Sequence, residues 1–193
     1  MIDLVLASAS PRRAALLRQL NLSFRIEPAS IAEDRRDQEL PDELVARLSR
    51  SKAQAVVNSD VMGSAPTVVI GADTIVVVGD RMLGKPECKD DAINMLVTLS
   101  GRQHRVLTAV TVADRDRTET IVVETIVVFR ELTIKECERY WSTGEPVDKA
   151  GGYGIQGLGA IFVASITGSY SNVVGLPLME TADGLRGFGI DCL

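Results

Sequence analysis

Residues 4–13 read LVLASASPRR, an apolar strand that runs directly into the start of a helix. The pair Ser10-Pro11 combines a good N-cap with a good first helical residue, so a helix is predicted over residues 11–20. The apolar run predicts a buried strand over residues 2–8, and a second strand is expected around Phe24-Arg25-Ile26. The chain therefore opens with a βαβ unit.

The first turn of this helix carries two cations, Arg12 and Arg13. The N-terminal end of a helix bears roughly +0.5 of an elementary charge, so two arginines there are unfavourable unless an anion lies between them. A phosphoryl group is the simplest such anion, because it accepts hydrogen bonds from backbone N–H groups and from guanidinium forks. The alternative is that both arginines point into solvent.

The composition indicates one α/β domain over residues 1–193. A compact domain of this length buries roughly 70% of its unfolded surface, which is enough for one sizeable core. Only 4% of the residues are aromatic, so the core must depend on Val, Leu, Ile and Ala, and this favours layers of helices and sheet. The net charge of -5 argues against a nucleic-acid binder, so an anionic substrate must be met by a local basic cluster.

The sequence also predicts a cytoplasmic protein. Cys88, Cys137 and Cys192 are far apart and have the spacing of neither a zinc site nor a disulfide framework, so reduced thiols are expected. No run approaches the roughly 18 apolar residues of a membrane span. Asp3 stands where a signal peptide would carry a basic region. No membrane association is expected.

The remaining elements follow from the spacing of apolar residues and from turn signals. The charged stretch at residues 31–40 predicts a surface loop, with a mobile flap as the alternative. Gly79-Asp80 predicts a hairpin turn. The sequence further predicts helices over 41–58, 89–99 and 133–143, strands over 67–78, 105–114, 120–130 and 160–163, and a last helix from Pro177.

Asp73 interrupts an apolar run long enough to cross the middle of a sheet. An unpaired carboxylate buried there would cost several kcal/mol, so it must have hydrogen bonds, a cation or a metal, or face a cleft. The alternative is that Gly71-Ala72-Asp73 forms a tight turn in which the aspartate caps its own backbone.

Two lysines stand in unusual places. Lys52 falls within the apolar arc of the helix predicted over residues 41–58, so its ammonium either enters a buried anionic site or extends to the helix edge. Lys85 lies between Gly84 and Pro86, which limit how the side chain is presented, although a solvated loop lysine is the alternative.

The glycine-rich segment Gly151–Gly157 has neither the P-loop pattern nor the context of a dinucleotide fingerprint. The carboxamide of Gln156 within it offers one acceptor and two donors, which suit the imide edge of uracil or thymine. A bond from Gln156 to loop backbone is the alternative. His104 is the only histidine, and no Gly-x-Ser-x-Gly accompanies it to support a hydrolase triad.

Several blocks of the chain match one family in order and over nearly the whole length. The blocks are Ser8–Arg13, Lys52, Gly71–Thr74, Gly84–Pro86, Ser100-Gly101, Asp148–Gly151, Tyr153–Gly157 and Val174–Pro177. Together they resemble the Maf family of nucleotide pyrophosphatases. Arg12 after the proline, Thr74 after the acid and Gln156 before a glycine look like the subgroup that hydrolyses dTTP and UTP.

The resemblance implies a mixed sheet flanked by helices, in two ITPase-like lobes around an active-site cleft, and a homodimer. It also implies a reaction in which a nucleoside triphosphate and water give the monophosphate and pyrophosphate, with Mg²⁺ or Mn²⁺ bridging the phosphates. Asp73 would then be the general base that activates water. Glu33 in the charged loop would be a second carboxylate beside Asp73 at the metal.

The same resemblance assigns the substrate contacts. Ser8 would hydrogen-bond phosphate, and Thr74 and Gln156 would read the base. The cations that would neutralise the triphosphate and the leaving pyrophosphate are Arg12, Arg13, Lys52 and Lys85. Two other functions stay open from the sequence, a nucleotide-binding regulator of cell division with little turnover and the same hydrolysis on modified nucleotides.

Overall fold

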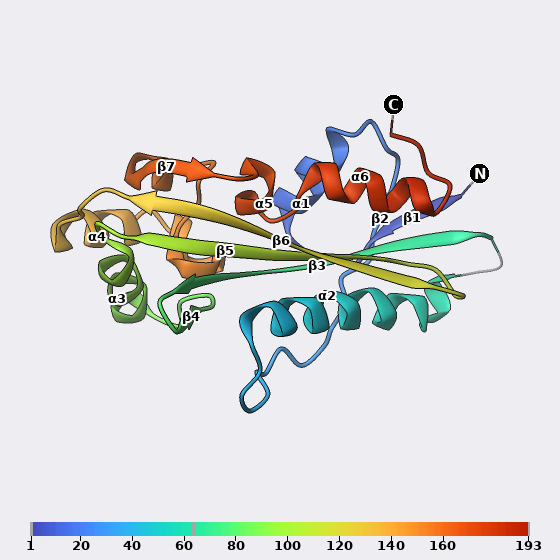
Figure 1. Cartoon of the computed structure of the whole chain (residues 1–193), viewed down its shortest axis with the longest axis horizontal. Coiled ribbons are helices and arrows are strands. Elements are labelled where there is room, and N and C mark those ends of the chain that lie inside the picture. Colours follow the sequence, from blue (N-terminus) through green and yellow to red (C-terminus); the bar gives the residue numbers. More distant parts are fainter. Residues whose placement is uncertain (1, 63–64, 193) are drawn as a thin grey trace. The chain divides into compact units, whose positions relative to one another are not determined.

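The computed structural model describes residues 2–62 and 65–192, and Figure 1 follows the chain through them. The strands are β1 (Asp3–Leu6), β2 (Arg25–Ile26), β3 (Thr67–Val78), β4 (Arg81–Leu83), β5 (Gln103–Ala113), β6 (Thr118–Phe129) and β7 (Val163–Thr167). The α-helices are α1 (Pro11–Arg18), α2 (Pro41–Val57), α3 (Lys89–Leu99), α4 (Ile134–Trp141), α5 (Tyr170–Val174) and α6 (Leu178–Gly187). Short 3₁₀ turns are η1 (Asp60–Met62), η2 (Glu145–Asp148), η3 (Ala150–Gly152) and η4 (Leu158–Phe162).

The strands form one mixed sheet in the order β2-β1-β3-β5-β6-β7, with β4 paired to β3. β1 runs parallel to both β2 and β3, whereas β4 runs antiparallel to β3 and β7 antiparallel to β6. The β1–β2 pair comes from the βαβ opening, and β3 pairs with the other edge of β1 after α2. The β3–β4 hairpin turns at Gly79-Asp80 as predicted. The predicted mixed sheet flanked by helices is confirmed.

The chain divides into two compact units. Unit 1 comprises Met1–Asp73, Thr108–Val123 and Gly175–Leu193, and unit 2 comprises Thr74–Leu107 and Glu124–Val174. The divisions fall within β3, close to the middle of β5 and within β6, so each of these strands contributes residues to both units. The expectation of one domain over residues 1–193, and that of a cleft, stay predictions.

Unit 1 is a layered structure in which α2 and α6 cover opposite faces of its strands (Figure 1). Small and β-branched side chains from β1, α2 and β3 pack together without aromatic rings, among them Val5, Ala53 and Val69, each 0% exposed. This agrees with the aliphatic core that the composition predicts. Such small side chains let α2 approach β3 closely.

Unit 2 has the chain's aromatic cluster. The rings of His104, Phe129 and Tyr153 meet edge to face, with centroids 4.7–5.5 Å apart. Phe162 packs on Phe129 and on Tyr140 of α4. His104 is buried, and its Nε2 lies 2.8 Å from the Tyr153 hydroxyl. The single histidine is therefore a core residue.

The structure rules out one alternative, corrects one predicted strand and adds one helix. Residues 71–73 form no turn, because β3 continues unbroken from Thr67 to Val78. The strand predicted over 160–163 is wrong, since Leu158–Phe162 is a 3₁₀ turn and the strand begins at Val163. No helix was predicted at α5, whose Asn172 N–H donates a hydrogen bond to the hydroxyl of Ser169, the residue just before the helix. Within the described part of the chain, no helix is long and apolar enough to cross a membrane.

Candidate active site

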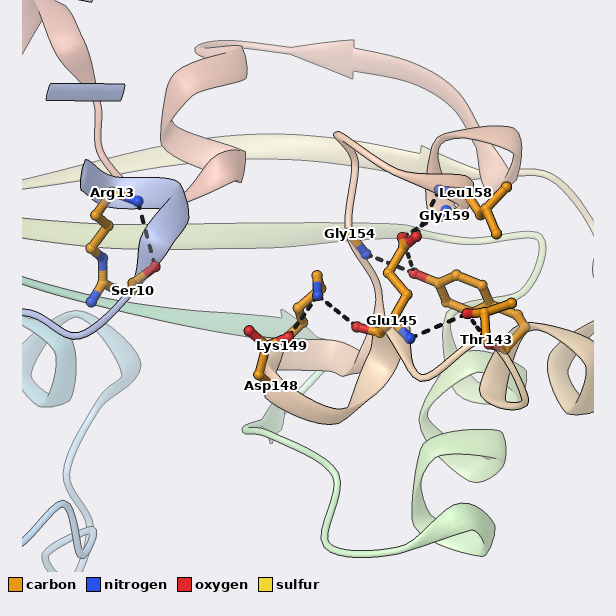
Figure 2. Close-up of polar contacts among 10 residues, drawn as sticks. Ser10, Arg13, Thr143, Glu145, Asp148, Lys149, Gly154, Leu158 and Gly159 are labelled. Carbon is orange, nitrogen blue, oxygen red and sulfur yellow. Dashed lines mark hydrogen bonds and ion pairs between the residues drawn. The ribbon is translucent and has the colours of Figure 1, made fainter. Parts of the chain in front are cut away.

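The predicted N-cap organises the start of α1. The Ser10 hydroxyl accepts a hydrogen bond from the Arg13 N–H at 3.4 Å, as Figure 2 shows. Ser8 is buried, and its hydroxyl accepts from the Ser10 N–H at 3.2 Å and from Nη1 of Arg13 at 3.2 Å. Ser8 and the first turn of α1 therefore form one hydrogen-bonded unit.

The side chain of Arg13 folds back onto the protein. Its Nε donates to the carbonyl oxygen of Gly175 at 2.8 Å. Burial lowers the pKa of Arg13 below its usual value, while the negative charges of Asp73 and Glu33 act in the opposite direction. The alternative in which both arginines point into solvent is wrong for Arg13. This guanidinium is within electrostatic reach of the two carboxylates and also supports the local fold through Gly175 and Ser8.

Lys52 of α2 lies between the same two carboxylates. Its Nζ donates to Asp73 Oδ1 at 2.7 Å and lies 2.6 Å from Glu33 Oε1. The side chains of Lys52 and Asp73 are only 11% and 13% exposed, whereas that of Glu33 is 50% exposed. Lys52 does not extend to the helix edge, and Asp73 has the cation that its burial requires.

A glycine on β3 makes this pairing possible. Gly71 lies so close to α2 that a Cβ atom there would overlap the carbonyl oxygen of Ser49 and approach Ala53 N to 2.7 Å. Asp73 lies two residues beyond Gly71 and therefore on the same face of the strand. Because the helix backbone contacts the strand at Gly71, the side chain of Lys52 is long enough to reach the Asp73 carboxylate.

The carboxylates suit a divalent cation in number and chemistry. Mg²⁺ is commonly held by one or two carboxylates together with substrate phosphate oxygens, and Asp73 and Glu33 both reach one atom, Lys52 Nζ. Among the described residues, no group of three or more His, Cys, Asp or Glu side chains could hold a metal by itself. A metal here would therefore depend on the substrate for its remaining ligands.

Arg12, in the first turn of α1 in unit 1, is half-buried, whereas three other predicted site residues belong to unit 2. Thr74 follows Asp73 directly on β3 and is half-buried. Lys85 is exposed just after β4, where the Gly84 carbonyl accepts from the Gly151 N–H at 2.9 Å and so joins this loop to the glycine-rich segment. Gln156 is exposed in a turn closed by the Gly157 N–H and the Gly154 carbonyl, 3.3 Å apart.

A network around this turn was missed by sequence reasoning. Glu145 and Tyr140 together hold the backbone of Gly154, Leu158 and Gly159. Figure 2 shows Glu145 beside these three residues. Lys149 is tied to this network, because its Nζ donates to Asp148 Oδ1 and to the Glu145 carbonyl, both at 2.6 Å. The glycines of residues 151–159 were the available sequence signal for this network. The sequence did not show that Gly157 and Gly159 leave space for the Glu145 carboxylate and the Tyr140 hydroxyl.

Comparison with known proteins identifies the family. The sequence matches the family described as Maf-like protein over residues 3–188. The chain belongs to the Maf family. The resemblance seen in the motif blocks is thereby confirmed for nearly the whole chain.

Maf relatives with a named activity are similar along almost their entire length. A dTTP/UTP pyrophosphatase of Pseudoalteromonas atlantica is 51% identical over 92% of this chain and 93% of its own. One of Vibrio vulnificus is 50% identical over 97% and 100%, and one of Desulforamulus reducens is 45% identical over 99% of both chains. Among solved structures, a nucleoside-triphosphatase described as a dITP/XTP pyrophosphatase, from Mycobacterium abscessus, has a TM-score of 0.46 and 13% identity, over 98% of this chain and 96% of its own.

Proposed function

We propose that this Maf protein hydrolyses dTTP and UTP to the monophosphate and pyrophosphate. The observation that carries the proposal is the pairing of Lys52 Nζ with Asp73 Oδ1 at 2.7 Å and with Glu33 Oε1 at 2.6 Å. A largely buried carboxylate next to cations suits an enzyme that must activate water beside a polyphosphate. The substrate is supported by the relatives at 45–51% identity that are named dTTP/UTP pyrophosphatases.

In this reaction Asp73 acts as the general base. Its carboxylate accepts a hydrogen bond from the Lys52 ammonium and would accept a proton from a water molecule. The water oxygen forms a bond to the α-phosphorus while the bond from that phosphorus to the bridging oxygen breaks. Pyrophosphate leaves with the electron pair, and the water proton remains on Asp73. No covalent intermediate is required.

The cations of the site stabilise the charge that develops on the triphosphate. Arg12 and Arg13 lie in the first turn of α1, whose dipole also favours an anion. Lys52 and Lys85 would neutralise further phosphate oxygens, and the Ser8 hydroxyl would bond one of them. Because the chain has a net charge of -5, attraction for a polyanion would depend on these cationic side chains.

The reaction is proposed to require Mg²⁺ or Mn²⁺. Asp73 and Glu33 would hold the cation together with phosphate oxygens of the substrate. When bound, it would neutralise phosphate charge and polarise the phosphoryl group. Lys52 would then have phosphate oxygens as partners in addition to the carboxylates.

Recognition of the base is assigned to Thr74 and Gln156. The amide of Gln156 can donate to a carbonyl and accept from the imide N–H that uracil and thymine share. Its exposure in a turn leaves the amide available to a ligand. Cytosine lacks that N–H group and would pair less well.

We further propose a cytoplasmic homodimer. Its three cysteines, Cys88, Cys137 and Cys192, are free thiols, as expected in a reducing compartment. Light scattering of the purified protein would give its mass in solution. A monomer at micromolar concentration would refute the dimer.

The proposed function is tested by measuring pyrophosphate release from a panel of ribo- and deoxyribonucleoside triphosphates, including methylated ones. Release from dTTP and UTP above the rest, present with Mg²⁺ or Mn²⁺ and lost with a chelator, is expected. Faster pyrophosphate release from nucleotides with another base would support the hydrolysis reaction but refute the preference for dTTP and UTP. Binding without release would refute the enzyme and favour a nucleotide-dependent regulator.

A further inference from the structure

The carboxylate of Glu145 accepts three hydrogen bonds, all from residues of unit 2. Its Oε1 accepts from the Tyr140 hydroxyl at 2.7 Å and from the Gly159 N–H at 3.1 Å, and its Oε2 accepts from the Leu158 N–H at 2.9 Å. The two backbone donors open η4, where N–H groups lack partners within the turn. Glu145 therefore fixes the chain immediately after Gln156.

Tyr140 fixes the chain immediately before Gln156. Its hydroxyl oxygen accepts from the buried Gly154 N–H at 2.9 Å while donating to Glu145. Residues 154–159 are thus held at both ends by one hydrogen-bonded pair, and Gln156 lies in the exposed turn between these ends. A shift of either anchor would move the Gln156 amide.

The glycines of this segment fit closely around the pair. A Cβ atom at Gly157 would overlap the Glu145 carboxylate, and one at Gly159 would lie 2.6 Å from the Tyr140 hydroxyl. Burial raises the pKa of Glu145, but the hydrogen bonds from Tyr140, Gly159 and Leu158 outweigh it, so the pKa is below its usual value. The carboxylate is therefore the form that the backbone donors hold.

We propose that Glu145 is a positioning residue which, with Tyr140, sets the orientation of Gln156 and so the preference for uracil and thymine bases. This inference rests on the proposed function, in which Gln156 reads the base. Glu145 itself touches no phosphate and takes no proton. Its effect is expected on affinity and base preference, since the turn contributes to binding in the ground state and the transition state alike.

The test compares steady-state kinetics of wild type and Glu145→Gln with dTTP, UTP and CTP. An amide at position 145 has one acceptor oxygen and so cannot satisfy all three donors. The KM for dTTP and UTP should rise roughly tenfold, about the cost of one good hydrogen bond, with kcat within about twofold and the KM for CTP unchanged. Glu138→Gln, an exposed charge removal on α4, is the matched control and should leave all values unchanged.

A second experiment separates positioning from a purely structural role. In a Gln156→Ala background, Glu145→Gln should cause no further rise in KM for dTTP or UTP, because the residue through which it acts is gone. Tyr140→Phe keeps the Glu145 carboxylate but removes the bridging hydroxyl, and should reproduce the selective KM effect if Glu145→Gln does not fold.

The outcomes distinguish the two claims. A wild-type protein that releases no pyrophosphate from dTTP or UTP refutes the proposed function and this inference with it. Three outcomes with an active wild type overturn the positioning role alone. The Glu145→Gln variant could keep wild-type kinetics, or it could lose kcat equally on every nucleotide. Its KM rise could also persist in the Gln156→Ala background.

Discussion

Gly71 of β3 packs directly against the carbonyl oxygen of Ser49 on α2, with no space for a side chain between strand and helix. The contact sets the distance between the two elements at the point where Lys52 meets Asp73. Backbone atoms cannot rotate away as a flexible side chain can, so any substitution at position 71 must separate the elements. A site built on an ion pair between these elements depends on this glycine.

Gly71→Ala should therefore lower the free energy of unfolding by about 3 kcal/mol, at the upper end of the usual cost of overpacking a core. Activity should fall with it, because the strand carrying Asp73 must move from Lys52. Urea denaturation measures the first effect and pyrophosphate release the second. Gly84→Ala, where an added Cβ atom meets nothing within 4 Å, should change stability by less than about 0.5 kcal/mol.

Asp73→Asn should reduce kcat by at least about a hundredfold, the scale of general-base catalysis, while the protein stays folded. Lys52 keeps Glu33 as a partner in this variant, so no buried cation is left unpaired. Circular dichroism and single-turnover pyrophosphate release provide the measurements. Asp116→Asn, in the exposed β5–β6 turn, is the control; a near wild-type rate in Asp73→Asn would remove this carboxylate from the mechanism.

Lys52→Met should destabilise the folded state by about 3 kcal/mol, because the largely buried Asp73 carboxylate loses its ammonium partner. Adding Asp73→Asn to Lys52→Met should recover part of that loss, since Glu33, the carboxylate that still lacks Lys52, is half exposed to solvent. Unfolding free energies of the two single variants and the double variant form the cycle. Strict additivity of the two changes would mean that the ion pair contributes nothing.

Arg12→Ala and Arg13→Ala should differ in what they disturb. Arg13→Ala removes the donors to Gly175 and Ser8 and should cost roughly 1–2 kcal/mol of stability as well as activity. Arg12→Ala should raise KM or lower kcat with little loss of stability in the absence of nucleotide. Melting temperatures beside steady-state kinetics decide this, and equal destabilisation by both substitutions would show that Arg12 is structural too.

The stability of the protein should fall between pH 6.5 and about pH 4 because of His104. Burial lowers the pKa of this imidazole from 6.5 to about 4. In that interval the unfolded chain binds a proton that the folded protein does not, so the free energy of unfolding decreases as the pH falls, by up to about 3 kcal/mol.

His104→Gln should lose this component, because glutamine does not titrate. The difference in unfolding free energy between wild type and variant should therefore change by about 3 kcal/mol from neutral pH to pH 4. Denaturation of both proteins across this range measures it. Parallel pH profiles would show that His104 titrates in the folded protein as it does in the unfolded chain.

The sequence was most informative where a residue contradicted its surroundings. A cation was among the predicted partners of Asp73 in its apolar strand, and a buried anionic site was one of two alternatives for Lys52 in its apolar helical arc. Each is the partner of the other. Glu33 was expected beside Asp73 only from the family resemblance. Its contact with Lys52 crosses from a charged loop to a helix, and no local pattern encodes that distance.

The Gly-rich part of unit 2 shows the limit of sequence reasoning. The apolar residues at 160–163 resemble a strand, but the chain there is turned by Glu145, whose hydrogen bonds to Leu158 and Gly159 span 13 and 14 residues of sequence. Local propensity is weak enough for such tertiary contacts to override it. Tyr140 and Glu145 have ordinary neighbours in sequence, so neither stood out.

The sequence by itself determined the α/β fold class, the Ser10 N-cap with its helix and the β3–β4 hairpin. Each depends on interactions within a few residues or on the spacing of apolar side chains, which the sequence states directly. Only the tertiary structure decided that Lys52 joins Asp73 to Glu33, that Arg13 turns to Gly175, and that Glu145 and Tyr140 hold the turn of Gln156. Those relationships require elements distant in sequence to pack at particular separations, and the packing follows from the core as a whole.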